Sequence, residues 1–206
     1  MKKALLTLPV AALLLAGCGG TPQGTPTAPT VEPATGSTTT ASASPSASAL
    51  AASGAKSSRG NIVKKVGEGA SVTDKDKTVA SFVINSITVD PQCTGSNAAP
   101  AKNGHFVALD VSMETTPDLA QSVNPQFGLA GYGWKAVADN GTTFNGDLGS
   151  FPAFMCFGDA ERFPSALGPG EKATGKIVLD VPTATGVLIH KQGFMPIGWE
   201  WEYPAK

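Results

Sequence analysis

The segment HFVALDVSME, residues 105–114, alternates apolar and polar side chains along its length. Asp110 and Ser112 fall on one side of an extended chain. Four apolar residues share the other side: Val107, Leu109, Val111 and Met113. Because successive side chains of a β-strand point to opposite faces, this period of two predicts a strand with one face against a core.

The same period continues on both sides of this segment. KIVLDVP, residues 176–182, alternates in the same way. TVASFVINSITV, residues 78–89, is rich in β-branched residues, which predicts a long strand, bent near Asn85 and Ser86. No stretch after residue 61 keeps a helical period of 3.6 residues, so the sequence predicts an all-β sandwich of seven or more strands.

Two glycine-containing pairs predict turns between these strands. Asn140-Gly141 lies between short apolar flanks, and both residues tolerate positive φ, so we expect a tight hairpin there. Pro169-Gly170 predicts a second turn, directly before a strand.

The order of these features resembles the Ig-like, immunoprotective extracellular domains of actinobacterial lipoproteins and secreted antigens. The resemblance covers roughly residues 66–203 and is carried by five segments: SFVINSITVDP, NGHFVALDVSMETTPD, DNGTTF, LGPGEKATGKIVLDVP and GVLIH. It implies an Ig-like antiparallel β-sandwich displayed outside the cell, without a defined ligand or catalytic set. The aromatic-rich segment SFPAFMCFGDAERFP, residues 150–164, departs from the compact pattern.

The first residues have the form of an export signal. Two lysines follow Met1, and residues 4–16 are uncharged and mostly apolar, a stretch too short to span a bilayer. Leu15-Ala16-Gly17-Cys18 then resembles the lipobox of bacterial lipoproteins, which implies cleavage after residue 17 and acylation of Cys18. We therefore expect residues 1–17 to be a signal peptide and Cys18 to anchor the chain to the extracytoplasmic face of the cell membrane. The alternative is an ordinary secreted protein cleaved near Ala16.

A polar linker follows the expected anchor. Residues 19–60 contain sixteen Ser or Thr and no aromatic residue, so this stretch cannot bury enough apolar surface to fold. We expect residues 18–60 to be a disordered tether, with O-glycosylation as a second use of its Thr and Pro, and residues 61–206 to form the domain. The net charge of −1 gives no electrostatic footprint for nucleic acid, and we expect no such partner.

Cys93 and Cys156 are the cysteines that remain once Cys18 is acylated. In an exported chain the simplest expectation is one disulfide between them. The alternative is a free catalytic Cys156 paired with His105 or His190, the two histidines of the chain.

The sequence carries no motif that predicts a metal, a cofactor or a catalytic site. Histidine and cysteine spacings typical of metal sites are absent, and no Ser lies in a GxSxG motif. Asp74 and Asp76 are better explained by a solvated turn than by a calcium loop, because the later ligands are missing. The glycines of FGLAGYGW, residues 127–134, are interpreted as strand irregularities. We expect no cofactor.

Two groups of aromatic residues are candidates for partner binding. In WEWEY, residues 199–203, Trp199, Trp201 and Tyr203 share one face of a strand, either as core or as an exposed stacking platform for a sugar or peptide. The second group surrounds Cys156: Phe154 and Phe157 flank it, supported by Phe151. These rings either plug one end of the sandwich or form an exposed apolar patch that binds a partner.

The sequence therefore predicts a surface lipoprotein that displays a non-catalytic binding module. Its expected partner is an envelope protein, a host-surface protein or a wall glycan. A secreted hydrolase with an unrecognised site is the alternative, and a solute-binding lipoprotein is disfavoured because one all-β domain lacks the two-lobed cleft of that class.

Overall fold

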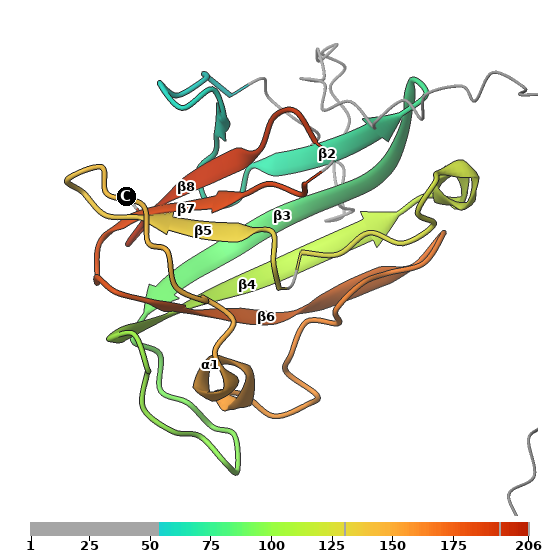
Figure 1. Ribbon diagram of the computed structural model, residues 1–206. Coiled ribbons are helices and arrows are strands. Elements are labelled where there is room, and N and C mark those ends of the chain that lie inside the picture. Colours follow the sequence, from blue (N-terminus) through green and yellow to red (C-terminus); the bar gives the residue numbers. More distant parts are fainter. Residues whose placement is uncertain (1–53, 130, 194, 206) are drawn as a thin grey trace, which may run out of the picture.

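The computed structural model describes residues 54–129, 131–193 and 195–205 and folds them into two four-stranded β-sheets (Figure 1). One sheet has the order β1 (Ile62–Val63), β8 (Trp199–Tyr203), β7 (Gly186–His190), β5 (Trp134–Val137). The other has the order β2 (Gly69–Asp74), β3 (Lys77–Val89), β4 (His105–Thr115), β6 (Lys172–Val181). Two short helices, η1 (Pro117–Gln121) and α1 (Phe151–Met155), lie in the connections. The predicted all-β sandwich is confirmed.

The expected signal peptide, Cys18 and the linker up to residue 53 lie outside the described residues. Within the described part of the chain, no helix has the length and apolar character needed to cross a membrane.

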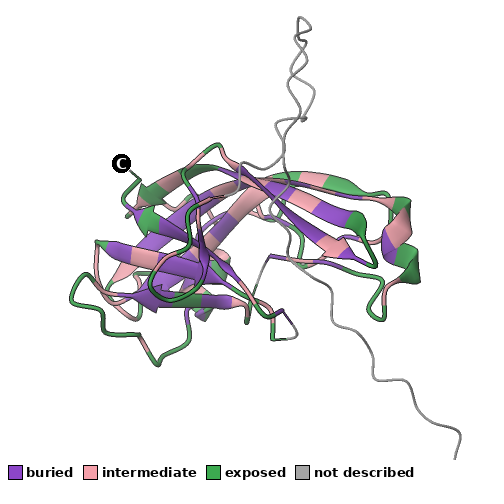
Figure 2. Cartoon of the chain, turned by 90° about the horizontal axis from the view of Figure 1, so that it is seen from above, coloured by how far each residue is buried: buried purple, intermediate pink, exposed green. Residues whose placement is uncertain are grey.

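The segment HFVALDVSME forms β4, which pairs antiparallel with β3 on one side and with β6 on the other. Leu109 lies opposite Ile87 of β3 and Ile177 of β6. All four apolar residues of its predicted inner face are at most 3% exposed: Val107, Leu109, Val111 and Met113. Figure 2 shows buried residues concentrated on the strands and exposed ones in the loops.

β3 has the predicted irregularity at its middle. Its register with β4 shifts between Ile84 and Ser86, so Asn85 has no partner residue across the pair. The Asn85 side chain instead donates to Asp110 and Ser112 on the outer face of β4. The bend predicted from the sequence is therefore a β-bulge.

The turns differ in detail from the prediction. In the hairpin after β5 the Gly141 N–H donates to the Ala138 carbonyl, and Gly141 has a φ of +83°, whereas Asn140 is not among the residues of positive φ. Only one residue of the pair thus uses the left-handed region. Between β2 and β3 it is Lys75 and Asp76 that have positive φ, +49° and +63°, as a two-residue hairpin turn requires.

The acidic pair beside this turn does not form a calcium loop. Asp76 is exposed in the turn, while Asp74 is buried and accepts a hydrogen bond of 2.6 Å from the Ser122 hydroxyl. Across the residues that the structure describes, no group of three or more His, Cys, Asp or Glu side chains could hold a metal ion.

Residues before the predicted domain start at residue 61 already contact the sandwich. The Val63 N–H donates to Ala55, and Lys56 forms a β-bridge with Ile62. Arg59 donates from Nε and Nη2 to the two carboxylate oxygens of Glu200, at 3.1 and 2.8 Å. This part of the chain leads into β1, which pairs parallel to β8.

The aromatic face of β8 belongs to the core. Trp199, Trp201 and Tyr203 are at most 2% exposed, and the Phe82 ring of β3 packs edge-on against Trp199 at a centroid distance of 5.0 Å. An exposed stacking platform at this strand is therefore wrong, because the rings face the opposite sheet.

Candidate functional site

Cys93 and Cys156 form a disulfide, which confirms the predicted pairing. Their Cα atoms lie 4.5 Å apart, and the Cys156 carbonyl accepts hydrogen bonds from the N–H groups of Thr94 and Gly95 at 2.8 and 2.9 Å. The loop after β3 is thus attached to the end of α1 by one covalent bond and two hydrogen bonds. A free catalytic Cys156 is ruled out, since its sulfur is in the disulfide.

The other end of α1 is attached to β6 through a buried carboxylate. The Ser150 hydroxyl caps the helix by accepting the Ala153 N–H at 3.3 Å, and it donates to Asp180 at 2.5 Å. Asp180 is fully buried and also accepts the N–H groups of Lys102 and Asn103, both at 2.8 Å. A helix of five residues is too short to be stable alone, so these contacts determine its position.

The three phenylalanines proposed as partner anchors do not share one environment. Phe151 is 72% exposed and Phe154 is 56% exposed, whereas Phe157 is only 6% exposed. Phe157 packs with Ala153 and Phe106 beneath the helix. Phe157 is therefore a core residue, and the exposed pair is Phe151 and Phe154.

Arg162 holds the Phe154 ring from one side. Its guanidinium carbon lies 3.9 Å from the centre of that ring, and its Nη1 donates to the Phe154 carbonyl at 3.2 Å. Arg162 also forms an ion pair with Asp159. The exposed ring is thus oriented by a cation–π contact before any partner arrives.

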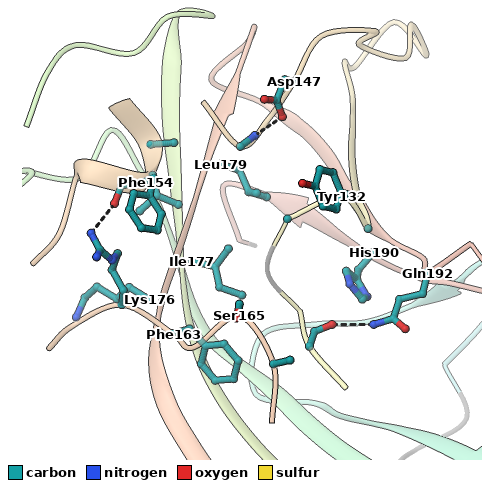
Figure 3. A pocket seen from close by; sticks show the side chains of 18 of the residues that line it. Tyr132, Asp147, Phe154, Phe163, Ser165, Lys176, Ile177, Leu179, His190 and Gln192 are labelled. Atoms are coloured by element: carbon teal, nitrogen blue, oxygen red, sulfur yellow. Dashed lines mark hydrogen bonds between the residues drawn. The ribbon is translucent and has the colours of Figure 1, made fainter. Parts of the chain in front are cut away.

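A groove of about 750 Å³ extends from α1 across the edge of β6 to the end of β7 (Figure 3). Phe154 lies on one side of it and Tyr132 and His190 on the other, with Ile177 and Leu179 of β6 between them. Most of the side chains that line it on the β6 side are apolar, which is typical of a ligand or partner site.

The basic residues at the groove have acidic partners. Arg162 pairs with Asp159, and Lys176 lies 3.7 Å from Glu161. The groove therefore presents no unbalanced positive charge that would select an anionic ligand.

His190 is the buried polar residue of the groove. Its side chain is 1% exposed, and burial lowers the pKa of His190 from 6.5 to about 4, so the imidazole is neutral at pH 7. Its neighbours are aromatic: the Trp134 ring lies at a centroid distance of 4.8 Å and that of Phe82 at 6.4 Å. Nδ1 has no hydrogen-bond partner in the described part of the chain.

His105, the other histidine, lies beside Asp90, with 2.8 Å between Nδ1 and the carboxylate. Both side chains are more than one third exposed, and neither lines the groove. The histidine with a carboxylate thus lies outside the groove, and the histidine in the groove has aromatic neighbours.

The groove was not predicted from the sequence, although the glycines of residues 127–134 carried a signal for it. A Cβ atom on Gly133 would lie 2.6 Å from Nε2 of His190, and one on Gly128 would lie 2.0 Å from the Ser165 carbonyl oxygen. Because glycine has no Cβ atom, the backbone at these two positions can lie directly against His190 and Ser165, which line the groove. A strand irregularity alone does not explain these close contacts.

We expect Phe157→Ala to lower the free energy of unfolding by about 3 kcal/mol, because it removes a buried ring. Phe154→Ala should cost less than about 1 kcal/mol, because more than half of that residue is exposed. Thermal melting separates the two, with a fall in midpoint of roughly 10 °C for Phe157→Ala alone. Equal falls for both variants would contradict the assignment of Phe154 to the surface.

No family model matches the sequence, and no curated protein matches it. One similar solved structure is that of MPT63, a secreted protein from Mycobacterium tuberculosis. The two sequences are 16% identical, the TM-score is 0.43, and the match covers 69% of this chain and 97% of the other.

Proposed function

We propose that the mature protein is a lipoprotein, anchored through Cys18 at the extracytoplasmic face of the cell membrane, that displays a non-catalytic binding module. The lipobox-like segment ending at Cys18 supports the anchor. The module is the β-sandwich from Gly54 onward, and its binding face consists of α1 and the adjoining groove.

Phe151 and Phe154 on α1 are the observation that carries this proposal. Two large aromatic side chains are exposed one helical turn apart on a segment that is attached at both ends, by Asp180 at Ser150 and by Cys93 at Cys156. Exposed aromatic residues on a rigid element are typical anchors at protein interfaces, because little conformational entropy is lost when they bind.

The strand order supports presentation of this face away from the anchor. The chain enters the domain beside β1, which lies at one edge of its sheet, whereas β5 lies at the other edge. The groove and α1 belong to the β5 and β6 side, and Figure 1 shows α1 on the far side of the sandwich from β1 and β2. The face that carries α1 is therefore not blocked by the point where the linker enters the domain.

The hydrolase alternative has less support. Acid–base catalysis by histidine usually requires a carboxylate or nucleophile within hydrogen-bond reach in a cleft. His190 lines the groove among aromatic rings, and His105 pairs with Asp90 outside it. This arrangement favours binding over catalysis.

Photo-crosslinking on intact cells tests the proposal. With p-benzoylphenylalanine in place of Phe154, we expect a discrete crosslinked partner, and with the same analogue in place of exposed Lys65 near β1, we expect none. Cys18→Ser should move the chain from the membrane fraction into the medium. The same crosslinks from both positions, or membrane retention of the Cys18 variant, would refute the corresponding part of the proposal.

A further inference from the structure

The outer edge of β6 is covered by the chain's own backbone at two places. The Lys176 N–H donates to the Glu161 carbonyl at 2.8 Å, and the Lys176 carbonyl accepts the Phe163 N–H at 2.9 Å. Four residues further along, the Asp180 N–H donates to the Leu148 carbonyl at 2.8 Å. These bonds show that the backbone groups of Lys176 and Asp180 point away from β4.

Val178 lies between these two covered positions. Backbone groups of an antiparallel edge strand alternate in direction, so the Val178 N–H and C=O point outward like those of Lys176 and Asp180. No bond from a described backbone or side-chain group outside the β4 pairing reaches them, and Val178 lines the groove. An unpaired N–H and C=O at a sheet edge form a template for pairing with another chain.

His190 is a second group in the groove that lacks a partner. Its buried ring has no hydrogen bond at Nδ1, and its Nε2 lies on the side of Gly133, which also lines the groove. A buried polar group without a partner in a native structure calls for an explanation. A bound group that hydrogen-bonds to Nδ1 would offset part of the cost of burying this ring among aromatic residues.

We propose that the groove binds an extended, uncharged apolar peptide segment of a partner protein, one residue of which pairs with the Val178 backbone. This inference rests on the proposed binding function and names the chemistry of its partner. A neighbouring side chain of the peptide, with an apolar body and a hydrogen-bonding tip such as that of tyrosine, lies over Ile177 and Leu179 and reaches His190.

The geometry favours a peptide over a lipid for three reasons. A peptide residue supplies both the acceptor and the donor that Val178 requires, whereas an acyl chain supplies neither. Side chains of an extended peptide alternate, and the groove has apolar walls on both sides of the β6 edge, at Phe157 and at Ile177. Arg162 and Lys176 are already paired with acidic residues, which disfavours an anionic headgroup.

Only a short piece of peptide fits along the edge. The covered positions at Lys176 and Asp180 are four residues apart, about 13 Å of strand, and the covering segments occupy both ends of that span. The partner segment therefore crosses the edge as a loop tip or chain end and does not extend the sheet.

The test is NMR titration of ¹⁵N-labelled chain, residues 18–206 with Cys18→Ser and the disulfide intact. The probe is acetyl-Val-Tyr-Val-amide. We expect saturable shifts of the Val178 amide and of the His190 ring nitrogens. The same peptide with a methyl group on both Val nitrogens should bind about fivefold to tenfold more weakly, because the residue beside Tyr that pairs with Val178 then loses its hydrogen bond to the edge.

Val178→Pro removes the N–H without breaking the pairing with β4 and should weaken peptide binding by at least the same factor, as reported by the Gly133 and His190 signals. Thr174→Pro is the matched control, because its N–H points outward at the exposed end of β6, away from the groove lining; it should bind like the unchanged chain. If Val178→Pro does not fold, the methylated peptide decides the question without any change to the protein.

Three outcomes would overturn the inference: equal binding of the methylated and unmethylated peptides, no shift at Val178, or larger shifts at Val178 and His190 with decanol or N,N′-diacetylchitobiose than with the peptide. The proposed function fails separately, through loss of the specific crosslink at Phe154. A persistent crosslink with no peptide binding would reject the peptide groove alone.

Discussion

Asp180→Ala is expected to lower the free energy of unfolding by about 5 kcal/mol, the largest effect of any single substitution considered for this domain. The carboxylate is fully buried and accepts three hydrogen bonds, from Ser150, Lys102 and Asn103. Its removal leaves the buried Ser150 hydroxyl and two partly buried N–H groups without this acceptor, and an unsatisfied buried donor costs about 1–3 kcal/mol. Urea denaturation gives the loss directly.

Asp110→Ala is the matched control for this prediction. Asp110 lies on the neighbouring strand β4, is partly exposed, and accepts one hydrogen bond of 3.2 Å from Asn85. Its loss should cost less than about 1 kcal/mol. If Asp180→Ala does not fold, Asp180→Asn provides the comparison, because it keeps the side-chain shape and one acceptor oxygen. Similar urea midpoints for the Asp180 and Asp110 variants would show that the buried carboxylate does not hold α1.

The substitution should also change the binding face. Asp180 is the link between β6, which carries Val178 and the groove, and Ser150 at the start of α1, which carries Phe151 and Phe154. Loss of this link should increase amide hydrogen exchange in α1 before it affects the central strands β3 and β4. One buried carboxylate thus positions both parts of the proposed binding face.

The strands could be predicted from the sequence because their signal is local. The period of two in residues 105–114 depends only on which side chains face the core, and β4 has that pattern of burial from Leu109 onward. Phe106 and Ala108 on its other face are buried as well, because they pack with Ala153 and Phe157. The bulge at Asn85 interrupts a β-branched run with two polar residues, a local signal as well. The disulfide could be predicted because two cysteines remained after the expected acylation of Cys18 and the sequence predicts export.

The environment of Glu200 could not be predicted, although its orientation could. Because Trp199 and Trp201 were predicted to share one face of WEWEY, alternation places Glu200 on the other face of β8. It is nevertheless 4% exposed, because Arg59 and Asn61, about 140 residues earlier, cover that outer face and bind its carboxylate. Pairing over such a separation leaves no mark on either segment.

The candidate site shows the same limit. Phe154 and Phe157 are three residues apart and both flank Cys156, yet α1 ends at Met155 and the chain then turns Phe157 inward. A helix of five residues has no periodicity from which this could be deduced. The groove is likewise built from loops and the edge of β6, whose contacts depend on the whole sandwich.

Reduction of the Cys93–Cys156 disulfide is expected to lower the free energy of unfolding by about 4 kcal/mol. The two residues are separated by 63 positions in the sequence, and the chain-entropy model gives this magnitude for a closed loop of that length. Cys156 is fully buried, so the crosslink connects the loop after β3 to the satellite cluster that contains Phe106 and Phe157. Guanidinium denaturation with and without reductant measures the difference.

The effect of reduction should be divided unequally between the core and the binding face. The core between the sheets contains Trp199, Trp201 and Tyr203 and does not depend on the disulfide, so its strands should remain folded in reduced protein without denaturant. At the end of α1, reduction removes the covalent link and leaves the hydrogen bonds from Thr94 and Gly95 to the Cys156 carbonyl and the one from Arg162 to the Phe154 carbonyl. Faster amide exchange in α1, and a weaker crosslink from position 154, are therefore expected in the reduced chain.

The control is Cys93→Ala/Cys156→Ala, which should match the reduced protein and be insensitive to reductant. Equal denaturation midpoints for oxidised and reduced chains would mean that the disulfide neither stabilises the domain nor preorganises the phenylalanines beside it.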